Sequence, residues 1–166
     1  CPSGELFAQE RVRRAVSRAA QRHRATLCRY PLGPGNEQLR RAVARHALGL
    51  GCQLEARDIV VTNGCLDAIS LCLRAVTRPG DVVALESPTY FGFLQILESL
   101  HLRALEIPTH PRTGLSLDAL QLAFDTQPVK AVLAVPTLSN PLGACMPAAE
   151  RRRLAQMVAE RGIPLI

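Results

Sequence analysis

Residues 129–143, VKAVLAVPTLSNPLG, decide the fold, because they join an apolar run to a polar turn. The apolar run over 129–135 is typical of a strand buried on both faces of a sheet. Ser139-Asn140-Pro141-Leu142-Gly143 follows it, and the proline and glycine fix a turn around the amide of Asn140. Open α/β sheets bind ligands just beyond the carboxyl ends of their strands. The stretch therefore predicts an α/β sheet with a ligand-binding turn at residue 140.

Strand and helix patterns alternate outward from this stretch. The strand patterns cover 58–62, 82–85, 102–106, 129–135 and 163–166. The helix patterns between them cover 64–77, 90–100, 116–124 and 147–161, and two more helices over 5–23 and 36–50 precede the first strand. Asn36 is the predicted N-cap of the helix over 36–50, and Gly51 its stop. This alternation predicts a mostly parallel sheet with crossover helices on both faces.

Length and composition indicate a globular domain. The chain has 166 residues, of which 48% are hydrophobic and 20% are charged. No apolar run reaches the roughly 18–20 residues that cross a bilayer, and no signal segment is visible, so we expect a cytoplasmic protein without membrane contact. The six cysteines include no C-x-x-C pair, so we expect no metal site. Because the chain opens on Cys1 and stops inside an apolar run, we expect a piece of a longer protein.

Basic charge is concentrated in the first third of the chain. Residues 1–50 carry ten arginines and three glutamates, although the net charge of the whole chain is only +6. Four arginines fall on one face of the helix over 5–23, namely Arg11, Arg14, Arg18 and Arg22. Such a stripe can bind nucleic acid or another partner, and it is also what an ordinary solvated helix face looks like.

The segment Asn63-Gly64-Cys65 opens a helix directly after the strand pattern over 58–62. The first backbone N–H groups of a helix have no partner inside it, so they can hold a phosphate, and a glycine lets the anion approach closely. The alternative is an ordinary strand-to-helix turn with Gly64 as its cap. Neither G-x-G-x-x-G nor a P-loop lysine is present, which disfavours a dinucleotide or a nucleoside triphosphate.

Two further side chains follow strand patterns. Tyr90 comes after the strand over 82–85, where an aromatic ring can stack on a flat heterocycle or, as a residue at the start of a helix, can simply pack on its neighbours. The amide of Asn140 can donate a hydrogen bond to a ligand oxygen, or it can cap its own backbone in an Asx-turn. The four histidines show no nucleophile or metal spacing, and no G-x-S-x-G elbow of a serine hydrolase occurs.

Five motifs in this order resemble the fold-type I pyridoxal-phosphate (PLP) aminotransferases of class I and II. Within them, the chain looks most like the aminotransferase-like domain of MocR-type, GntR-family transcriptional regulators. The resemblance covers about residues 3–166. The motifs are Tyr30-x-x-Gly33-x-Gly35-x-x-x-Leu39-Arg40, Val61-Thr62-Asn63-Gly64-Cys65, Pro79-Gly80-Asp81, Glu86-Ser87-Pro88-Thr89-Tyr90 and Ser139-Asn140-Pro141-Leu142-Gly143.

The resemblance implies a fold, a cofactor and a set of roles. The fold is the incomplete large domain of such a protein, with an N-terminal helical arm over 1–29 and a partial PLP-binding domain over 30–166. The cofactor is pyridoxal 5'-phosphate. Its phosphate would lie on the backbone N–H groups of Gly64, Cys65 and Leu66. Tyr90 would stack on the pyridine ring, Asn140 would bind the ring hydroxyl oxygen, and Tyr30 would reach the phosphate of the neighbouring subunit in a homodimer.

The chain departs from the family's pattern in its catalytic groups. PLP enzymes bind the cofactor covalently through a lysine, and the only lysine here, Lys130, begins the strand whose far end leads to Asn140. The acid that pairs with the ring nitrogen and the arginine that binds the substrate carboxylate lie, in the family, beyond residue 166. We therefore assign no catalytic residue and expect this chain alone to be inactive.

Three functions remain open. The preferred one is the effector-sensing part of a transcriptional regulator, in which PLP with an amino acid or keto acid controls a DNA-binding domain absent from this chain. The second is part of a free-standing amino-acid aminotransferase. The third is a basic module that itself binds nucleic acid or another partner.

Overall fold

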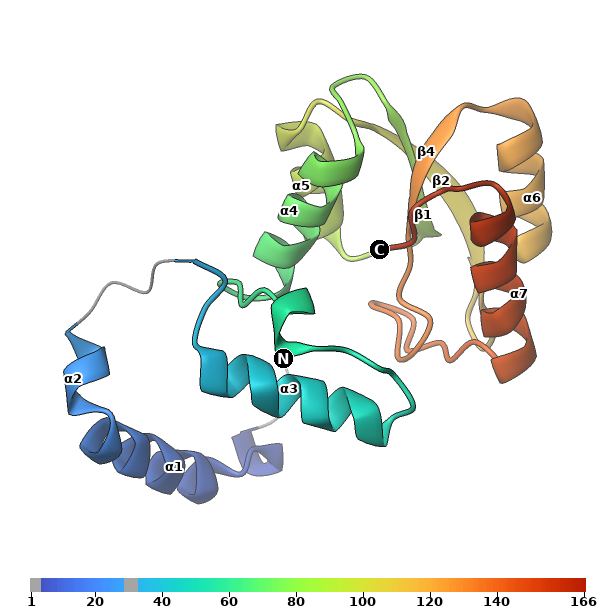
Figure 1. Cartoon of the computed structure of the whole chain (residues 1–166). Coiled ribbons are helices and arrows are strands. Elements are labelled where there is room, and N and C mark those ends of the chain that lie inside the picture. Colours follow the sequence, from blue (N-terminus) through green and yellow to red (C-terminus); the bar gives the residue numbers. More distant parts are fainter. Residues whose placement is uncertain (1–3, 29–32) are drawn as a thin grey trace. The chain divides into compact units, whose positions relative to one another are not determined.

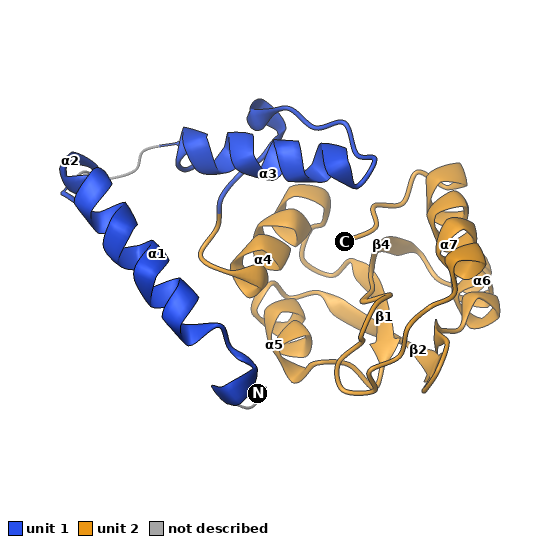
Figure 2. Cartoon of the chain, turned by 90° about the horizontal axis from the view of Figure 1, so that it is seen from below, with its two compact units in different colours: residues 1–61 blue, residues 62–166 orange. Residues whose placement is uncertain are grey.

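The computed structural model describes residues 4–28 and 33–166. By their contacts the residues form two compact units, 1–61 and 62–166, which Figure 2 draws in blue and orange. The boundary that we expect between an arm over 1–29 and a domain over 30–166 stays a prediction. Among the described residues, no helix is long and apolar enough to cross a membrane.

The first unit is helical. Its elements are η1 (Gly4–Leu6), α1 (Gln9–Arg22), α2 (Arg24–Leu27), α3 (Glu37–Gly49) and η2 (Ala56–Asp58). Asn36 caps α3 as predicted, since its side chain accepts a hydrogen bond from the Leu39 N–H at 3.1 Å. Gly51 follows the end of α3 with φ 83°, a conformation that favours glycine. None of the described residues of this unit is buried, so it contains no apolar core of its own.

The strand predicted over 58–62 is wrong. Residues 56–58 form the short η2 turn, and residues 59–62 pair with no strand. The side chain of Val60 is 63% exposed, and the Val61 N–H donates to the carbonyl of Pro34 at 2.9 Å. The three apolar residues Ile59, Val60 and Val61 gave a strand-like pattern, but the segment lies along residue 34 of its own unit instead of entering a sheet.

The second unit holds the sheet. Its elements are α4 (Cys65–Val76), β1 (Val82–Ser87), α5 (Phe91–Ser99), β2 (Arg103–His110), β3 (Gly114–Leu115), α6 (Leu117–Thr126), β4 (Val129–Leu133) and α7 (Ala148–Glu160). Apart from β3, each of these elements was predicted within a few residues. In Figure 1, α4 and α5 cover one face of the sheet, and α6 and α7 cover the other.

The strand order is β3-β2-β1-β4, with β1 parallel to both β2 and β4. The short β3 runs antiparallel to β2, at a place where the sequence predicted only a loop. The predicted strand over 163–166 forms a single parallel bridge, between Val132 and Leu165. The mostly parallel sheet with crossover helices is therefore confirmed.

The apolar core has two halves, one on each face of the sheet. Val83 and Leu85 of β1 pack toward α4 and α5, against Ile69, Leu73, Phe93 and Leu97. Val82 and Ala84 of the same strand pack toward α6 and α7, against Leu117, Leu120, Leu154 and Met157. Since alternate residues of a strand point to opposite faces, burying both faces fixes the register of β1. This core carries the loops at the edges of the sheet.

Candidate functional site

The first turn of α4 offers unpaired backbone donors. Gly64 lies before it with φ 103° and places no side-chain cap on the helix. The first hydrogen bond of the helix runs from the Ala68 N–H to the Gly64 carbonyl, at 3.1 Å. In the described part of the chain, the N–H groups of Cys65 and Leu66 therefore have no acceptor, and both residues are exposed. Such a helix start attracts an anion.

One acid lies in the same turn of α4. The carboxylate of Asp67 accepts a hydrogen bond from the Asn63 N–H at 2.9 Å. The Thr62 hydroxyl donates to the Gly64 carbonyl at 3.1 Å. These two bonds fix the backbone around Gly64, where an added β-carbon would meet nothing within 4 Å. The turn is thus fixed by bonds that do not use the N–H groups of Cys65 and Leu66.

Tyr90 lies directly before α5, and its ring is half-buried. The ring centroid is 4.6 Å from that of Phe91 and 5.6 Å from that of Phe93, which it meets edge-on. The side chain also packs against the apolar core on the α4–α5 face of the sheet. Packing on neighbouring side chains at the start of a helix, which was the alternative interpretation, is therefore part of what positions this ring.

Asn140 lies at the tip of a tight turn after β4. Ser139 is buried and forms the base of the turn, because its hydroxyl accepts from the Ala144 N–H at 3.1 Å and its N–H donates to the Ala144 carbonyl at 3.0 Å. A bridge between Thr137 and Cys145 closes the same turn. In the part of the chain that the structure describes, the exposed Asn140 side chain has no hydrogen bond, so it does not form the Asx-turn that was its alternative role.

Glu86 is a residue that the sequence analysis did not single out. It lies near the end of β1 and is 2% exposed, although it carries a carboxyl group. The carboxyl accepts a hydrogen bond from the Val135 N–H at 3.2 Å. Burial raises the pKa of Glu86 above its ordinary value, and the hydrogen bond from Val135 offsets part of that rise. An acid at the end of a buried apolar strand was the signal available in the sequence.

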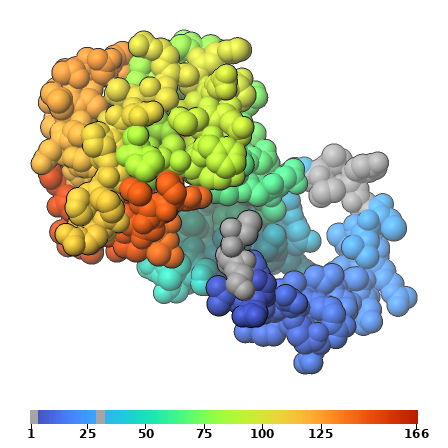
Figure 3. Space-filling model, turned by 180° about the vertical axis from the view of Figure 1, so that it is seen from behind, coloured from blue at the N-terminus to red at the C-terminus, as the bar shows by residue number. Residues whose placement is uncertain are grey.

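The three predicted segments emerge at one edge of the sheet. β1 and β4 are parallel, so their carboxyl ends lead to Tyr90 and to Asn140 at the same edge. α4 begins at that edge too (Figure 1). The segments that follow β1 and β4 lie side by side in Figure 1 and on the face shown in Figure 3, and the bond between Glu86 and Val135 joins their bases. Tyr30 lies outside the described residues.

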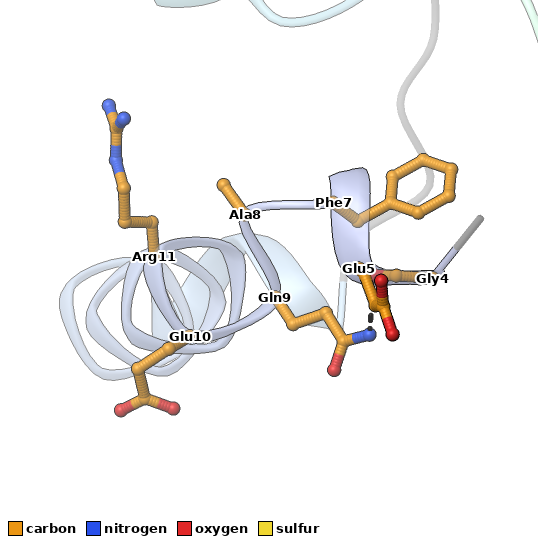
Figure 4. Close-up of a pocket in the computed structure, with 7 residues that line it drawn as sticks. All are labelled: Gly4, Glu5, Phe7, Ala8, Gln9, Glu10 and Arg11. Carbon is orange, nitrogen blue, oxygen red and sulfur yellow. Dashed lines mark hydrogen bonds between the residues drawn. The ribbon is translucent and has the colours of Figure 1, made fainter. Parts of the chain in front are cut away.

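A second surface feature lies in the helical unit. A shallow hollow at the start of α1 is lined by residues between Gly4 and Arg11, where the Gln9 side chain donates to the Gly4 carbonyl at 3.1 Å (Figure 4). Within residues 4–28 and 33–166, no cluster of ligating side chains could hold a metal ion.

The arginine stripe of α1 is exposed along its length. One of its members, Arg14, is paired with Glu10 at 2.9 Å, and Arg13 binds the same carboxylate. These two hydrogen bonds lower the pKa of Glu10, that from Arg13 most. Part of the positive charge of the stripe is therefore balanced within the helix itself, as on an ordinary solvated face.

Comparison with known proteins gives the family. The family described as aminotransferase class I and II matches residues 3–166. The chain is 41% identical over 150 residues to the uncharacterised HTH-type transcriptional regulator YjiR of Escherichia coli, covering 90% of the chain and 32% of that protein. It is 36% identical to a second such regulator of Escherichia coli, YdcR, covering 99% of the chain and 35% of that protein.

A solved structure gives the same result for the fold. LysN, the α-aminoadipate aminotransferase of Thermus thermophilus, was crystallised with N-(5'-phosphopyridoxyl)-L-leucine. It matches 99% of this chain with a TM-score of 0.84 and 29% identity, and the chain covers 41% of it. The chain thus spans about a third to two fifths of the length of these relatives. Its fold is that of part of a fold-type I aminotransferase domain, and the chain belongs to the aminotransferase class I and II family.

Proposed function

We propose that this chain is part of a PLP-binding, effector-sensing domain of a DNA-binding transcriptional regulator. The backbone N–H groups at Gly64, Cys65 and Leu66 hold the phosphate. Tyr90 stacks on the pyridine ring, and the Asn140 amide donates to the ring hydroxyl oxygen. When bound, the cofactor supplies an electron sink for chemistry on amino acids.

The residues present fit this cofactor. An uncapped helix start suits a phosphate, because its donors and its dipole both favour negative charge. The observation that carries the proposal is the Asn140 amide, which has no partner among the described residues and follows β4 at the edge of the sheet where α4 begins. An exposed asparagine in a well-fixed turn, with no internal partner, is arranged for an external one.

The regulator is preferred to the enzyme because of the relatives that the chain resembles. Two of the relatives are named HTH-type transcriptional regulators, and they match the chain at 41% and 36% identity, against 29% for the aminotransferase LysN. The second candidate is part of an amino-acid aminotransferase, which LysN favours.

The proposal includes partners and a location. The full-length protein forms a homodimer, and Tyr30 of one subunit reaches the phosphate site of the other. An amino acid or a keto acid is the effector, or the substrate if the protein is an enzyme. DNA is bound through a GntR-type helix-turn-helix domain outside this chain, and the protein acts in the cytoplasm.

Cofactor binding is tested on the full-length protein that contains this chain. The apoprotein is titrated with PLP and with pyridoxal, which lacks the phosphate. We expect PLP to bind at least about 10-fold more tightly, because charge-assisted bonds from α4 act on the phosphate alone. Equal affinity for the two compounds would contradict the phosphate assignment.

Regulator and enzyme are then separated by two assays on the same protein. Binding to the DNA directly upstream of its own gene is measured with and without PLP and a mixture of amino acids. The regulator predicts a change in DNA affinity and no release of keto acid. Keto-acid release with no DNA binding would favour the enzyme instead.

A further inference from the structure

The bond between Glu86 and Val135 extends the pairing of β1 with β4 by one step. The last backbone pair of these two strands is Leu85 with Leu133. Beyond it, the Ala134 N–H turns away from β1 and donates to the Ile166 carbonyl at 3.1 Å. By the alternation of a strand, the Val135 N–H faces β1, and there it finds the carboxyl of Glu86 in place of a backbone carbonyl.

This carboxyl lies in an unusual setting for an acid. By alternation, Glu86 follows Val82 and Ala84 on β1, both of which are buried and apolar. A side chain that is 2% exposed at such a position is normally apolar, since burying a carboxylate is costly. The raised pKa of Glu86 reflects that cost. The presence of a carboxyl group here, despite this cost, indicates that the Val135 N–H needs a hydrogen-bond acceptor.

The position of the bond between Glu86 and Val135 suggests why this N–H needs an acceptor. Glu86 lies four residues before Tyr90, and Val135 lies five residues before Asn140. In the described part of the chain, this is the one side-chain hydrogen bond between the end of β1 and the segment that follows β4. It joins the two loops at the point where the strands stop pairing.

We propose that Glu86 is a positioning residue that sets the spacing between Tyr90 and Asn140. This inference rests on the proposed cofactor site, because the two residues are there the ring-stacking group and the donor to the ring oxygen. Glu86 itself contacts neither the cofactor nor a substrate. It acts by fixing the backbone at Val135, from which the turn that carries Asn140 begins.

Three variants of the full-length protein test this role. Glu86→Gln keeps an oxygen that can accept from the Val135 N–H. Glu86→Met keeps the length of the side chain and removes the acceptor. Leu120→Ala is the control, because Leu120 is fully buried on α6, outside the two loops, and its truncation lowers stability.

The first readout is the dissociation constant for PLP, measured well below the unfolding temperature of every variant. We expect Glu86→Met to weaken binding about 10-fold, as the loss of one buried hydrogen bond does. Glu86→Gln and Leu120→Ala should each stay within about threefold of the wild type. Unchanged affinity in Glu86→Met, or an equal loss in Leu120→Ala, would overturn the positioning role.

The second readout does not depend on the cofactor. Amide hydrogen exchange of residues 134–146 should be faster in Glu86→Met than in the wild type, and unchanged in Glu86→Gln. If the wild-type protein does not bind PLP, the proposed function fails, and this exchange alone decides the role of Glu86. Equal exchange in Glu86→Met and the wild type would then refute it.

Discussion

The ring of Tyr90 lies directly against Gly92. A β-carbon added at Gly92 would stand 2.5 Å from Cε1 of Tyr90 and 3.1 Å from its Cδ1. Gly92 has an ordinary helical conformation and is buried in α5, so its glycine is explained by the ring and not by its backbone angles. The absence of one methyl group thus sets where the proposed stacking ring can lie.

Gly92→Ala is therefore expected to displace Tyr90. An alanine inside a helix normally stabilises a protein by about 0.5–1 kcal/mol over glycine, and here the contact with the ring should cancel that gain. PLP affinity of the full-length protein should fall as the ring moves. The matched control is Gly49→Ala at the end of α3, where the added methyl meets nothing within 4 Å. Equal gains in the free energy of unfolding at both positions, with PLP affinity unchanged, would contradict this picture.

Asn140→Ala should separate binding from stability. Because the Asn140 side chain has no partner in the described chain, its removal should change the free energy of unfolding by less than about 0.5 kcal/mol. PLP affinity should fall by roughly 10-fold, since one hydrogen bond to the ring oxygen is lost.

Asn36→Ala is the control and should behave in the opposite way, because Asn36 caps α3. It should cost about 1 kcal/mol of stability and leave PLP binding intact. Urea unfolding and PLP titration of the two variants measure both effects, and a large loss of stability in Asn140→Ala would argue against a free amide.

The sequence correctly predicted the parts of the fold in which the spacing of apolar residues and the positions of turn residues indicate the same element. The strand at 129–133 and the helix after Asn36 are examples, because burial and capping are local to each. The strand predicted at 58–62 failed because an apolar triplet does not reveal whether a neighbouring strand is free to pair with it. The short strand β3 was not predicted, because two residues are too few to show an alternation of apolar and polar side chains.

The candidate site divides in the same way. Tyr90 and Asn140 follow strands, so their place at one edge of the sheet could be inferred from the order of elements alone. Glu86 was missed because its role depends on a hydrogen bond between residues 49 positions apart, and no local pattern encodes the partner. The close approach of the Tyr90 ring to Gly92 also depends on side-chain packing that spacing does not give.

The buried carboxyl of Glu86 predicts a pH dependence of stability. Its pKa is raised above the unfolded value of 4.5, first by burial, so between these two pKa values the folded protein binds more protons than the unfolded one. The wild type should lose stability as the pH rises through that window, by about 1.4 kcal/mol for each unit of pKa difference. Glu86→Gln does not titrate there. The free energy of unfolding of Glu86→Gln, minus that of the wild type, should therefore increase from pH 4 upward and then level off.

Urea unfolding at a series of pH values measures this difference. The control is Leu120→Ala, which removes no titrating group, so its difference from the wild type should stay constant over the same range. A difference for Glu86→Gln that is flat with pH would show that the carboxyl has the same pKa in the folded and unfolded states.

The position of Lys130 predicts that this chain alone does not transaminate. Lys130 is its only lysine, and it is exposed at the start of β4, whereas the Asn140 turn follows the end of that strand. A primary amine at the wrong edge of the sheet cannot reach a cofactor held between α4 and the loops after β1 and β4.

The chain, supplied with PLP, an amino acid and a keto acid, should form product no faster than PLP free in solution. Lys130→Arg should leave that rate unchanged. Borohydride reduction can attach some PLP to Lys130, and the amount attached should be the same in the wild-type chain and in Asn140→Ala. Product formation above the free-cofactor rate that disappears in both Lys130→Arg and Asn140→Ala would mean that the lysine reaches the site, and the assignment of this edge of the sheet would then be wrong.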